Sequence, residues 1–113
     1  MPPIKSTRVS VAMVGLIYGA LISGASAQGV SQGGRIAEKY CARCHAIGMA
    51  GASRHPSAPP FRTIAAKGHI DDLQEALAEG LTVGHPDMPE FQFPPEQIAS
   101  LLAYLKSLAT SGR

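Results

Sequence analysis

The residues with the clearest chemical potential lie in one short run, Cys41-Ala42-Arg43-Cys44-His45. Residues three and four apart share a face of a helix, so the two cysteines and the histidine are expected to point the same way. A C-x-x-C-H run is the attachment signature of a c-type haem, because two thiols at this spacing can add to the two vinyl groups of one porphyrin. The histidine that follows can then bind the iron. The run therefore predicts one covalent haem c, attached through Cys41 and Cys44, with His45 as an iron ligand.

Other interpretations of this run are weaker. A thioredoxin-type C-x-x-C is expected beside a βαβ pattern, and the sequence contains no convincing strand. A zinc site needs two more ligands at short spacing, whereas His69 and His85 are sixteen residues apart. A structural disulfide would give His45 no role. Both cysteines of the chain lie in the run, so no separate disulfide is expected to staple the fold.

The segment His85-Pro86-Asp87-Met88-Pro89 contains the candidates for a second iron ligand, and its prolines exclude a regular helix. Met88 follows the histidine of the haem run at a distance that lets its loop reach the opposite face of the ring. A thioether ligand opposite histidine raises the reduction potential and leaves no open position on the iron. Met88 is therefore the candidate sixth ligand, and His85, which would give bis-histidine ligation at a lower potential, stays open as the alternative. Met49 is only four residues past His45 and is not expected to reach across the ring. His55 and His69 are expected to be surface histidines.

The N-terminal segment has the features of an export signal. Two basic residues precede an uncharged apolar run over 9–25, and Ala25-Ser26-Ala27 is a small-x-small cleavage pattern. We expect residues 1–27 to be a secretory signal peptide that is cleaved after Ala27, leaving a domain over 28–113. A retained membrane anchor is the alternative, because no charged residue occurs over 9–34 and such a stretch is long enough to cross a bilayer.

Charge and size limit the classes of function. The chain has 113 residues, ten of them basic and eight acidic, and Lys5 and Arg8 belong to the signal, so eight basic residues face eight acidic ones in the remaining domain. A near-neutral domain is not expected to bind nucleic acid, which requires a strongly basic face. An export signal implies an oxidising compartment, here the periplasm. A domain this small has a marginal core, and a buried porphyrin would supply much of the missing apolar contact.

Periodicity predicts an all-α domain without a sheet. A short mobile lead over 28–32 is expected to precede a first helix from Gly33 or Gly34 to about Cys44, because apolar residues recur there at helical spacing. Two loops rich in glycine and proline are expected over 46–60 and 81–94. Between them a short helical turn is expected over 61–67, and a helix from about Asp71 to Glu79 should end at the glycine that follows it.

The last helix has the clearest pattern of the chain. Pro95 is expected at its first turn, where proline is tolerated. Its apolar side chains recur at spacings that place them on one face, and these are Ile98, Leu101, Leu102, Leu105 and Leu108. The first and last helices should cross near Gly33 or Gly34, because both helices need a partner and only glycine permits a close approach.

The loop over 46–60 is expected to cover one face of the haem. A metal-bound histidine nearly always donates its other N–H group to an acceptor that fixes the ring. A carbonyl of the rigid pair Pro59-Pro60 suits this role, and the alternative is that the prolines only stiffen the turn.

Over residues 33–109 the sequence resembles the class I c-type cytochromes. The resemblance rests on the glycine-led first helix, CARCH, the Pro-x-Phe segment at 59–61, the Met-Pro pair at 88–89 and the aromatic-bearing last helix. It implies a small cytochrome c-like fold of three main helices wrapped around one covalently bound haem. It also implies that the carbonyl of Pro59 accepts a hydrogen bond from the His45 ring, which adds Pro59 to the expected cofactor-binding residues.

The same resemblance implies that Gly33 is the contact point where the last helix, near Leu101 and Tyr104, crosses the first. Two features depart from the family's pattern. Phe61 stands where the family often has leucine, and the usual ring of lysines is absent, so the family's docking mode is not carried over.

The expected function is that of a periplasmic mono-haem c-type cytochrome, not an enzyme, that carries single electrons between a redox protein donor and acceptor in transient encounters. One alternative is an electron-transfer subunit of a dehydrogenase or oxidase complex. Another is a haem sensor or enzyme with a labile sixth ligand, against which Met88 argues because it would close the sixth position.

Overall fold

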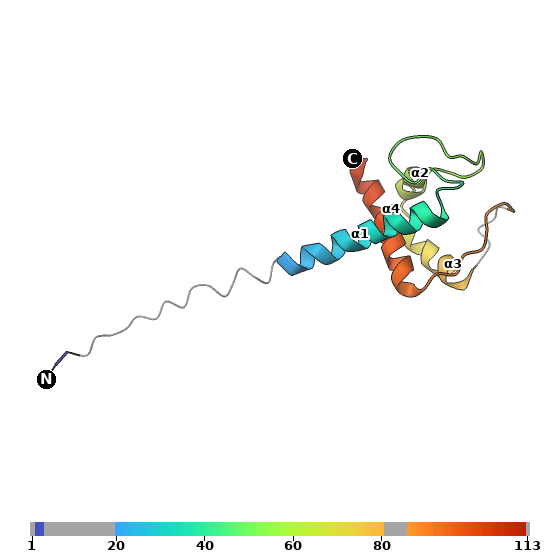
Figure 1. Cartoon of the computed structure of the whole chain (residues 1–113). Helices are drawn as coiled ribbons and strands as arrows, with labels where there is room; N and C mark the ends of the chain where they lie inside the picture. The colour runs from blue at the N-terminus through green and yellow to red at the C-terminus, as the bar shows by residue number, and fades with distance from the viewer. Residues whose placement is uncertain (1, 4–19, 81–85, 113) are drawn as a thin grey trace.

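All regular structure in the computed structural model, which describes residues 2–3, 20–80 and 86–112, is helical (Figure 1). In chain order the elements are α1 (Ala20–Tyr40), α2 (Phe61–Ala66), the 3₁₀ helix η1 (Ile70–Asp72), α3 (Leu73–Glu79) and α4 (Pro95–Ser111). No strand occurs within the described ranges. The predicted all-α fold class is therefore confirmed.

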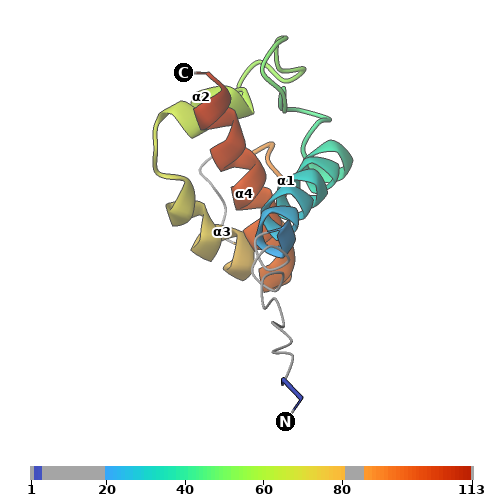
Figure 2. The same cartoon turned by 90° about the vertical axis from the view of Figure 1, so that its left-hand side faces the viewer.

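The two long helices, α1 and α4, cross each other and form the largest helix–helix contact of the fold (Figures 1 and 2). Gly33 lies at the crossing. A Cβ atom at this position would lie 2.7 Å from the Cβ atom of Tyr104 and would overlap the carbonyl oxygen of Ser100. At Gly34 the nearest atom to a Cβ would be a ring carbon of Tyr104 at 3.4 Å, which is an ordinary contact. The predicted crossing near these glycines is confirmed, and Gly33 is the position that requires glycine.

The core lies between the crossed helices and the short elements that cover them. The five apolar side chains predicted to form one face of α4 are all buried, which confirms that stripe: Ile98, Leu101, Leu102, Leu105 and Leu108. They pack with Ile36 and Ala37 from α1, with Phe61 and Ala65 from α2, and with Ile70 from η1. Burial of this apolar surface is the main favourable contribution to folding.

The bounds of α1 differ from those expected. The helix already includes residues 28–32, so the prediction of a mobile lead there is wrong; the stretch contains no proline to break the helix. The helix also ends at Tyr40, earlier than predicted. The N–H groups of Cys41 and Ala42 both donate to the carbonyl of Ala37, at 2.8 and 3.0 Å, which widens the last turn. The cysteine–histidine run therefore lies in a turn after α1 and not on the helix itself.

The short elements follow the predicted pattern closely. Gly68, with φ of 81°, follows α2, and Gly80, with φ of 74°, caps α3 in the left-handed conformation that glycine favours. Pro95 occupies the first turn of α4 as predicted. Part of the predicted loop over 81–94, namely 81–85, lies outside the described residues. Among the described helices, none is both long and apolar enough to span a bilayer.

Candidate functional site

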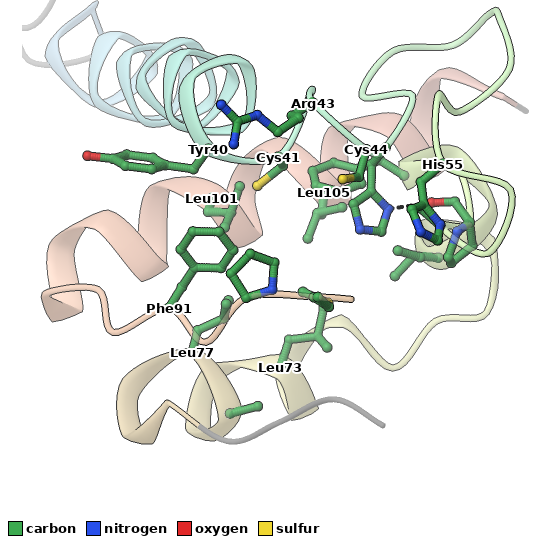
Figure 3. Close-up of a pocket in the computed structure, with 18 of the residues that line it drawn as sticks. Tyr40, Cys41, Arg43, Cys44, His55, Leu73, Leu77, Phe91, Leu101 and Leu105 are labelled. Atoms are coloured by element: carbon green, nitrogen blue, oxygen red, sulfur yellow. Dashed lines mark hydrogen bonds between the residues drawn. The ribbon is translucent and has the colours of Figure 1, made fainter. Parts of the chain in front are cut away.

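The side chains singled out in the sequence surround one cavity of about 530 Å³. This volume lies within the range of cofactor and ligand pockets. The cavity is bounded by the turn after α1, by α3 and α4, and by the loops on either side (Figure 3). Figure 3 shows the sulfur atoms of Cys41 and Cys44 on one side of the space, with Leu73, Leu77 and Phe91 facing them. The walls are mostly apolar, as a buried porphyrin requires.

The two thiols are free and partly buried, so they do not form a disulfide. They reach the cavity from a turn in which the N–H groups of Cys44 and His45 both donate to the carbonyl of Cys41, at 3.1 and 2.9 Å. Burial raises the pKa of the Cys41 thiol to about 11, because the charged thiolate is poorly solvated there. A thioether carries no proton and no charge, so an apolar environment of this kind suits a cysteine sulfur bonded to a porphyrin.

The His45 imidazole is oriented by the loop that follows it. Its Nδ1 atom lies 2.7 Å from the carbonyl oxygen of Pro59. A carbonyl only accepts hydrogen bonds, so Nδ1 carries the proton and Nε2 keeps a lone pair that can bind a metal. The Phe61 ring lies beside the imidazole, with 5.3 Å between ring centroids. The structure thus contains the contact that the family resemblance implies, and the role of Pro59 in binding a cofactor stays a prediction.

Several hydrogen bonds hold the loop over 46–60 in place. The N–H group of Phe61 donates to the carbonyl of Ala46 at 2.8 Å and closes the loop at its base. The hydroxyl of Ser53 accepts from the N–H group of Ala46 at 3.0 Å. The Arg62 guanidinium donates to the carbonyl of Gly51 at 2.7 Å. The histidine and its proline acceptor therefore lie on a braced scaffold.

Met88, the candidate sixth ligand, also lines the cavity, together with its neighbours Asp87 and Pro89. Its side chain is half-buried. All five cofactor-binding residues expected from the sequence line this cavity: Cys41, Cys44, His45, Pro59 and Met88. Their roles toward haem and iron stay predictions. The competing ligand His85 lies outside the described residues. Met49 is an exposed residue of the loop after the haem run.

His55 and His69 were both expected at the surface, and they differ. The side chain of His69 is 83% exposed, which confirms that expectation. The side chain of His55 is only 27% exposed, lines the cavity and lies 3.0 Å from a carboxylate oxygen of Asp87, so the expectation is wrong there. A lone histidine in a loop has no periodicity that would reveal such a partner, which is 32 residues away in the sequence.

An aromatic group at the rim was not recognised in the sequence. The rings of Phe91 and Phe93 stack at 5.5 Å, and Tyr40 meets both of them edge-on, at 6.2 and 5.4 Å between centroids. All three rings line the cavity. The signal that could have indicated them is the Phe-Gln-Phe alternation directly before α4, which places both rings on the same side of an extended segment.

The donor set fits a covalently held haem. Two free thiols, an imidazole with its Nε2 lone pair available and a thioether converge on one apolar space. Within the described residues, no group of three or more His, Cys, Asp and Glu side chains is arranged to hold a metal ion. The described residues therefore provide no set of ligands for the zinc site that was considered as an alternative for this run.

Comparison with known proteins gives the same family. A family model described as cytochrome c oxidase, cbb3-type, subunit III matches residues 28–105. This region contains the complete C-x-x-C-H run and every side chain that lines the cavity. The chain is also 31% identical to cytochrome c-552 of Bradyrhizobium diazoefficiens over 86 residues, which are 76% of this chain and 81% of that protein. No solved structure matches the chain significantly. The chain belongs to the class I c-type cytochromes, a family that binds haem c covalently and transfers electrons.

Proposed function

We propose that this protein is an exported mono-haem cytochrome that carries single electrons between redox proteins in the periplasm. The observation that carries the proposal is the cavity itself, in which the haem-attachment run and a methionine from a distant loop face one space. When bound, the haem iron supplies the one-electron chemistry by alternating between its ferric and ferrous states. The protein supplies attachment, ligands and a largely apolar surrounding.

Each side chain has a distinct task in this proposal. Cys41 and Cys44 hold the porphyrin through thioether bonds. His45 binds the iron through Nε2, because Nδ1 donates to the carbonyl of Pro59 and this hydrogen bond fixes both tautomer and ring orientation. Met88 would supply the iron with a neutral sulfur donor, which favours the ferrous state and raises the reduction potential. Leucines from α3 and α4 exclude water from the ring.

A closed sixth position separates this proposal from that of a haem enzyme or gas sensor. Those functions need an open or labile coordination site for a substrate or gas. The half-buried Met88 side chain at the cavity supports a closed site. Carbon monoxide should therefore bind poorly to the reduced wild-type protein and readily to Met88→Ala.

A second candidate function is that of an electron-transfer subunit in a dehydrogenase or oxidase complex. The description of the matching family model as a subunit of a cbb3-type oxidase favours this candidate. The haem site would be the same in both cases, and the difference lies in the partner. Cell fractionation separates them, because a free carrier is recovered alone from the periplasmic fraction, whereas a subunit is recovered with its complex from membranes solubilised in a mild detergent.

Export is part of the proposal. The matching region begins at residue 28, directly after the expected cleavage site, which supports a boundary between a signal peptide over 1–27 and the cytochrome domain over 28–113. The mass of the mature protein tests cleavage and haem attachment together. After expression with the haem-attachment machinery, the exported protein should lack residues 1–27 and carry the mass of one porphyrin. A mature protein with no added porphyrin would refute the proposal, and one that keeps residues 1–27 would favour the membrane anchor.

A further inference from the structure

We infer that His55 and Asp87 form a clasp that holds the Met88 segment against the cavity, so that His55 is a positioning residue for the sixth ligand. The inference rests on the proposed function, in which Met88 binds the iron. The clasp joins two loops that both contribute residues to the lining of the cavity. One loop follows the haem-attachment run, and the other carries Met88.

The backbone of His55 is fixed to the attachment run itself. Its N–H group donates to the carbonyl of Cys44 at 3.1 Å, and its carbonyl accepts from the N–H group of Ala58 at 3.1 Å. Figure 3 shows His55 beside Cys44 at this end of the cavity. The position of His55 is therefore coupled to the position of the residue that attaches the porphyrin.

The imidazole of His55 is also held in one tautomer. Its Nδ1 atom accepts a hydrogen bond from the N–H group of Ser57 at 3.1 Å, so in the neutral ring the proton lies on Nε2. The Nε2–H group then donates to the Oδ2 atom of Asp87 at 3.0 Å. A carboxylate is an acceptor only, so donor and acceptor match, and a hydrogen bond to a charged acceptor is stronger than one between neutral groups.

Asp87 precedes Met88 directly, so the clasp acts one residue away from the candidate ligand. Pro86 and Pro89 flank the pair and restrict the backbone. In the described part of the chain, the next anchors lie further along: the Gln92 amide donates to the carbonyl of Glu79 at 3.2 Å, and the N–H group of Phe93 donates to the carbonyl of Leu77 at 3.1 Å. The clasp is therefore an anchor on the N-terminal side of Met88, and Gln92 and Phe93 provide anchors on its C-terminal side.

The expected consequence is a change in the population of the state in which Met88 is detached from the iron. An external ligand such as imidazole binds the ferric iron only in that state, so its apparent affinity is proportional to the population of the detached state. The clasp lowers this population. Its loss should leave most molecules with Met88 bound, because the iron–sulfur bond itself is unchanged.

The test is an imidazole titration of the ferric holoprotein, with covalent haem verified by mass. In His55→Ala, imidazole should bind about tenfold more tightly than in wild type, the size expected for loss of one charge-assisted hydrogen bond at a partly exposed site. The iron–sulfur charge-transfer band should persist before imidazole is added. His55→Gln retains an N–H donor near the position of Nε2 and should bind imidazole nearly as wild type does.

Asp87→Ala gives a second route that leaves the loop around His55 intact. It should also increase imidazole affinity about tenfold, and the double variant His55→Ala/Asp87→Ala should add little to either single change, because partners in one contact are not additive. Asp71→Ala is the matched control, since it removes a surface carboxylate that pairs with Lys106 at 2.7 Å. The control should leave imidazole affinity unchanged.

The possible results separate the clasp from the function on which it rests. Unchanged imidazole affinity in both His55→Ala and Asp87→Ala, or an equal increase in Asp71→Ala, would overturn the clasp. If Met88→Ala loses the charge-transfer band in the same experiments, the failure concerns the clasp alone. If Met88→Ala keeps the band, Met88 is not the ligand, and the proposed ligation and the clasp fall together.

Discussion

The two loops that enclose the cavity are held in different ways. The loop over 46–60 is closed at its base by a backbone hydrogen bond and braced inside by Ser53 and Arg62. The Met88 segment, residues 86–93, is held by the His55–Asp87 contact at one end. At its other end it is held by the bonds of Gln92 and Phe93 to α3 and by the packing of two phenylalanine rings on Tyr40.

This difference matches the tasks of the two sides. Covalent attachment needs thiols and an imidazole in one fixed geometry, which a braced loop and a helix end provide. A sixth ligand only has to reach the iron, and a segment anchored at its ends suffices for that. Changes in the helical scaffold, or in the bracing contacts of Ser53 and Arg62, should therefore lower the free energy of unfolding and leave the iron spectrum intact. Changes at Met88 should alter the iron spectrum, and changes at the His55–Asp87 contact should alter the affinity of the iron for imidazole.

The largest effect on stability is expected from Gly33→Ala, at the crossing of α1 and α4. The added Cβ would overlap the carbonyl oxygen of Ser100 and lie 2.7 Å from the Tyr104 Cβ, so the helices must move apart. The free energy of unfolding should fall by about 3 kcal/mol or more, as for severe overpacking. Gly34→Ala is the control and should stay within about 1 kcal/mol of wild type. Denaturant unfolding of the two holoproteins measures the difference, and equal losses would contradict the assigned crossing.

A smaller loss in the free energy of unfolding is expected from Tyr104→Phe. The Tyr104 hydroxyl donates to the carbonyl of Ile47 at 2.6 Å and ties α4 to the residues after the haem run. Its removal should lower the free energy of unfolding by about 1.5 kcal/mol at neutral pH, with the iron spectrum unchanged.

The effect of Tyr104 should also depend on pH. Burial, and then the nearby Glu38 carboxylate, raise the pKa of Tyr104 above its ordinary value of 10.0. Above pH 10 the tyrosine of the unfolded chain loses its proton first, so the unfolded state is favoured and the wild type loses stability. Tyr104→Phe has no hydroxyl that can lose a proton. The difference in free energy of unfolding between the two proteins should therefore narrow from pH 10 upward. A difference that widens above pH 10 would contradict a raised pKa of Tyr104 in the folded protein.

Arg62→Ala tests the braced loop directly. The guanidinium donates to the carbonyls of Gly48 and Gly51, at 3.5 and 2.7 Å, and the loop is partly exposed, so water can replace it. We expect a loss of about 1 kcal/mol in unfolding free energy. The reduction potential and imidazole affinity should not change. A marked change in imidazole affinity would show that the two sides of the cavity are coupled more strongly than their contacts indicate.

The smallest effect is expected from Asp71→Asn, which breaks the ion pair with Lys106 between η1 and α4. Both side chains are more than half exposed, so solvent screens the pair. The free energy of unfolding should change by about 0.5 kcal/mol or less. Added salt should reduce this difference further, and a loss above about 1 kcal/mol at moderate salt would contradict the assignment as a surface pair.

The sequence predicted well those parts of the molecule whose structure depends on residues close together in the chain. The apolar stripe of α4, the proline at its start and the glycine caps each follow from spacing or backbone conformation within a few residues. The crossing near Gly33 or Gly34 was predictable because both helices need a partner and only glycine permits a close approach. The haem-attachment run is similarly local, since its chemistry depends only on the spacing of three side chains.

The parts that the sequence did not predict are the bounds of α1 and the contacts between residues far apart in the chain. The helical residues 28–32 of α1 were missed because glycine and polar residues there give no helical periodicity. Its end at Tyr40 depends on two N–H groups sharing the carbonyl of Ala37, which no spacing rule indicates. The His55–Asp87 contact and the rings of Phe91 and Phe93 on Tyr40 join residues far apart in the chain, so only the folded structure shows them.

The most direct test of the account is the ferric absorption spectrum of Met88→Ala, recorded beside wild type and His85→Ala. The charge-transfer band at the red edge of the visible spectrum reports an iron–sulfur bond. It should be present in wild type and in His85→Ala and absent in Met88→Ala, whose reduction potential should also fall because a donor that favours ferrous iron is lost. A band that persists in Met88→Ala, or that is absent from the wild-type protein, would contradict ligation by Met88.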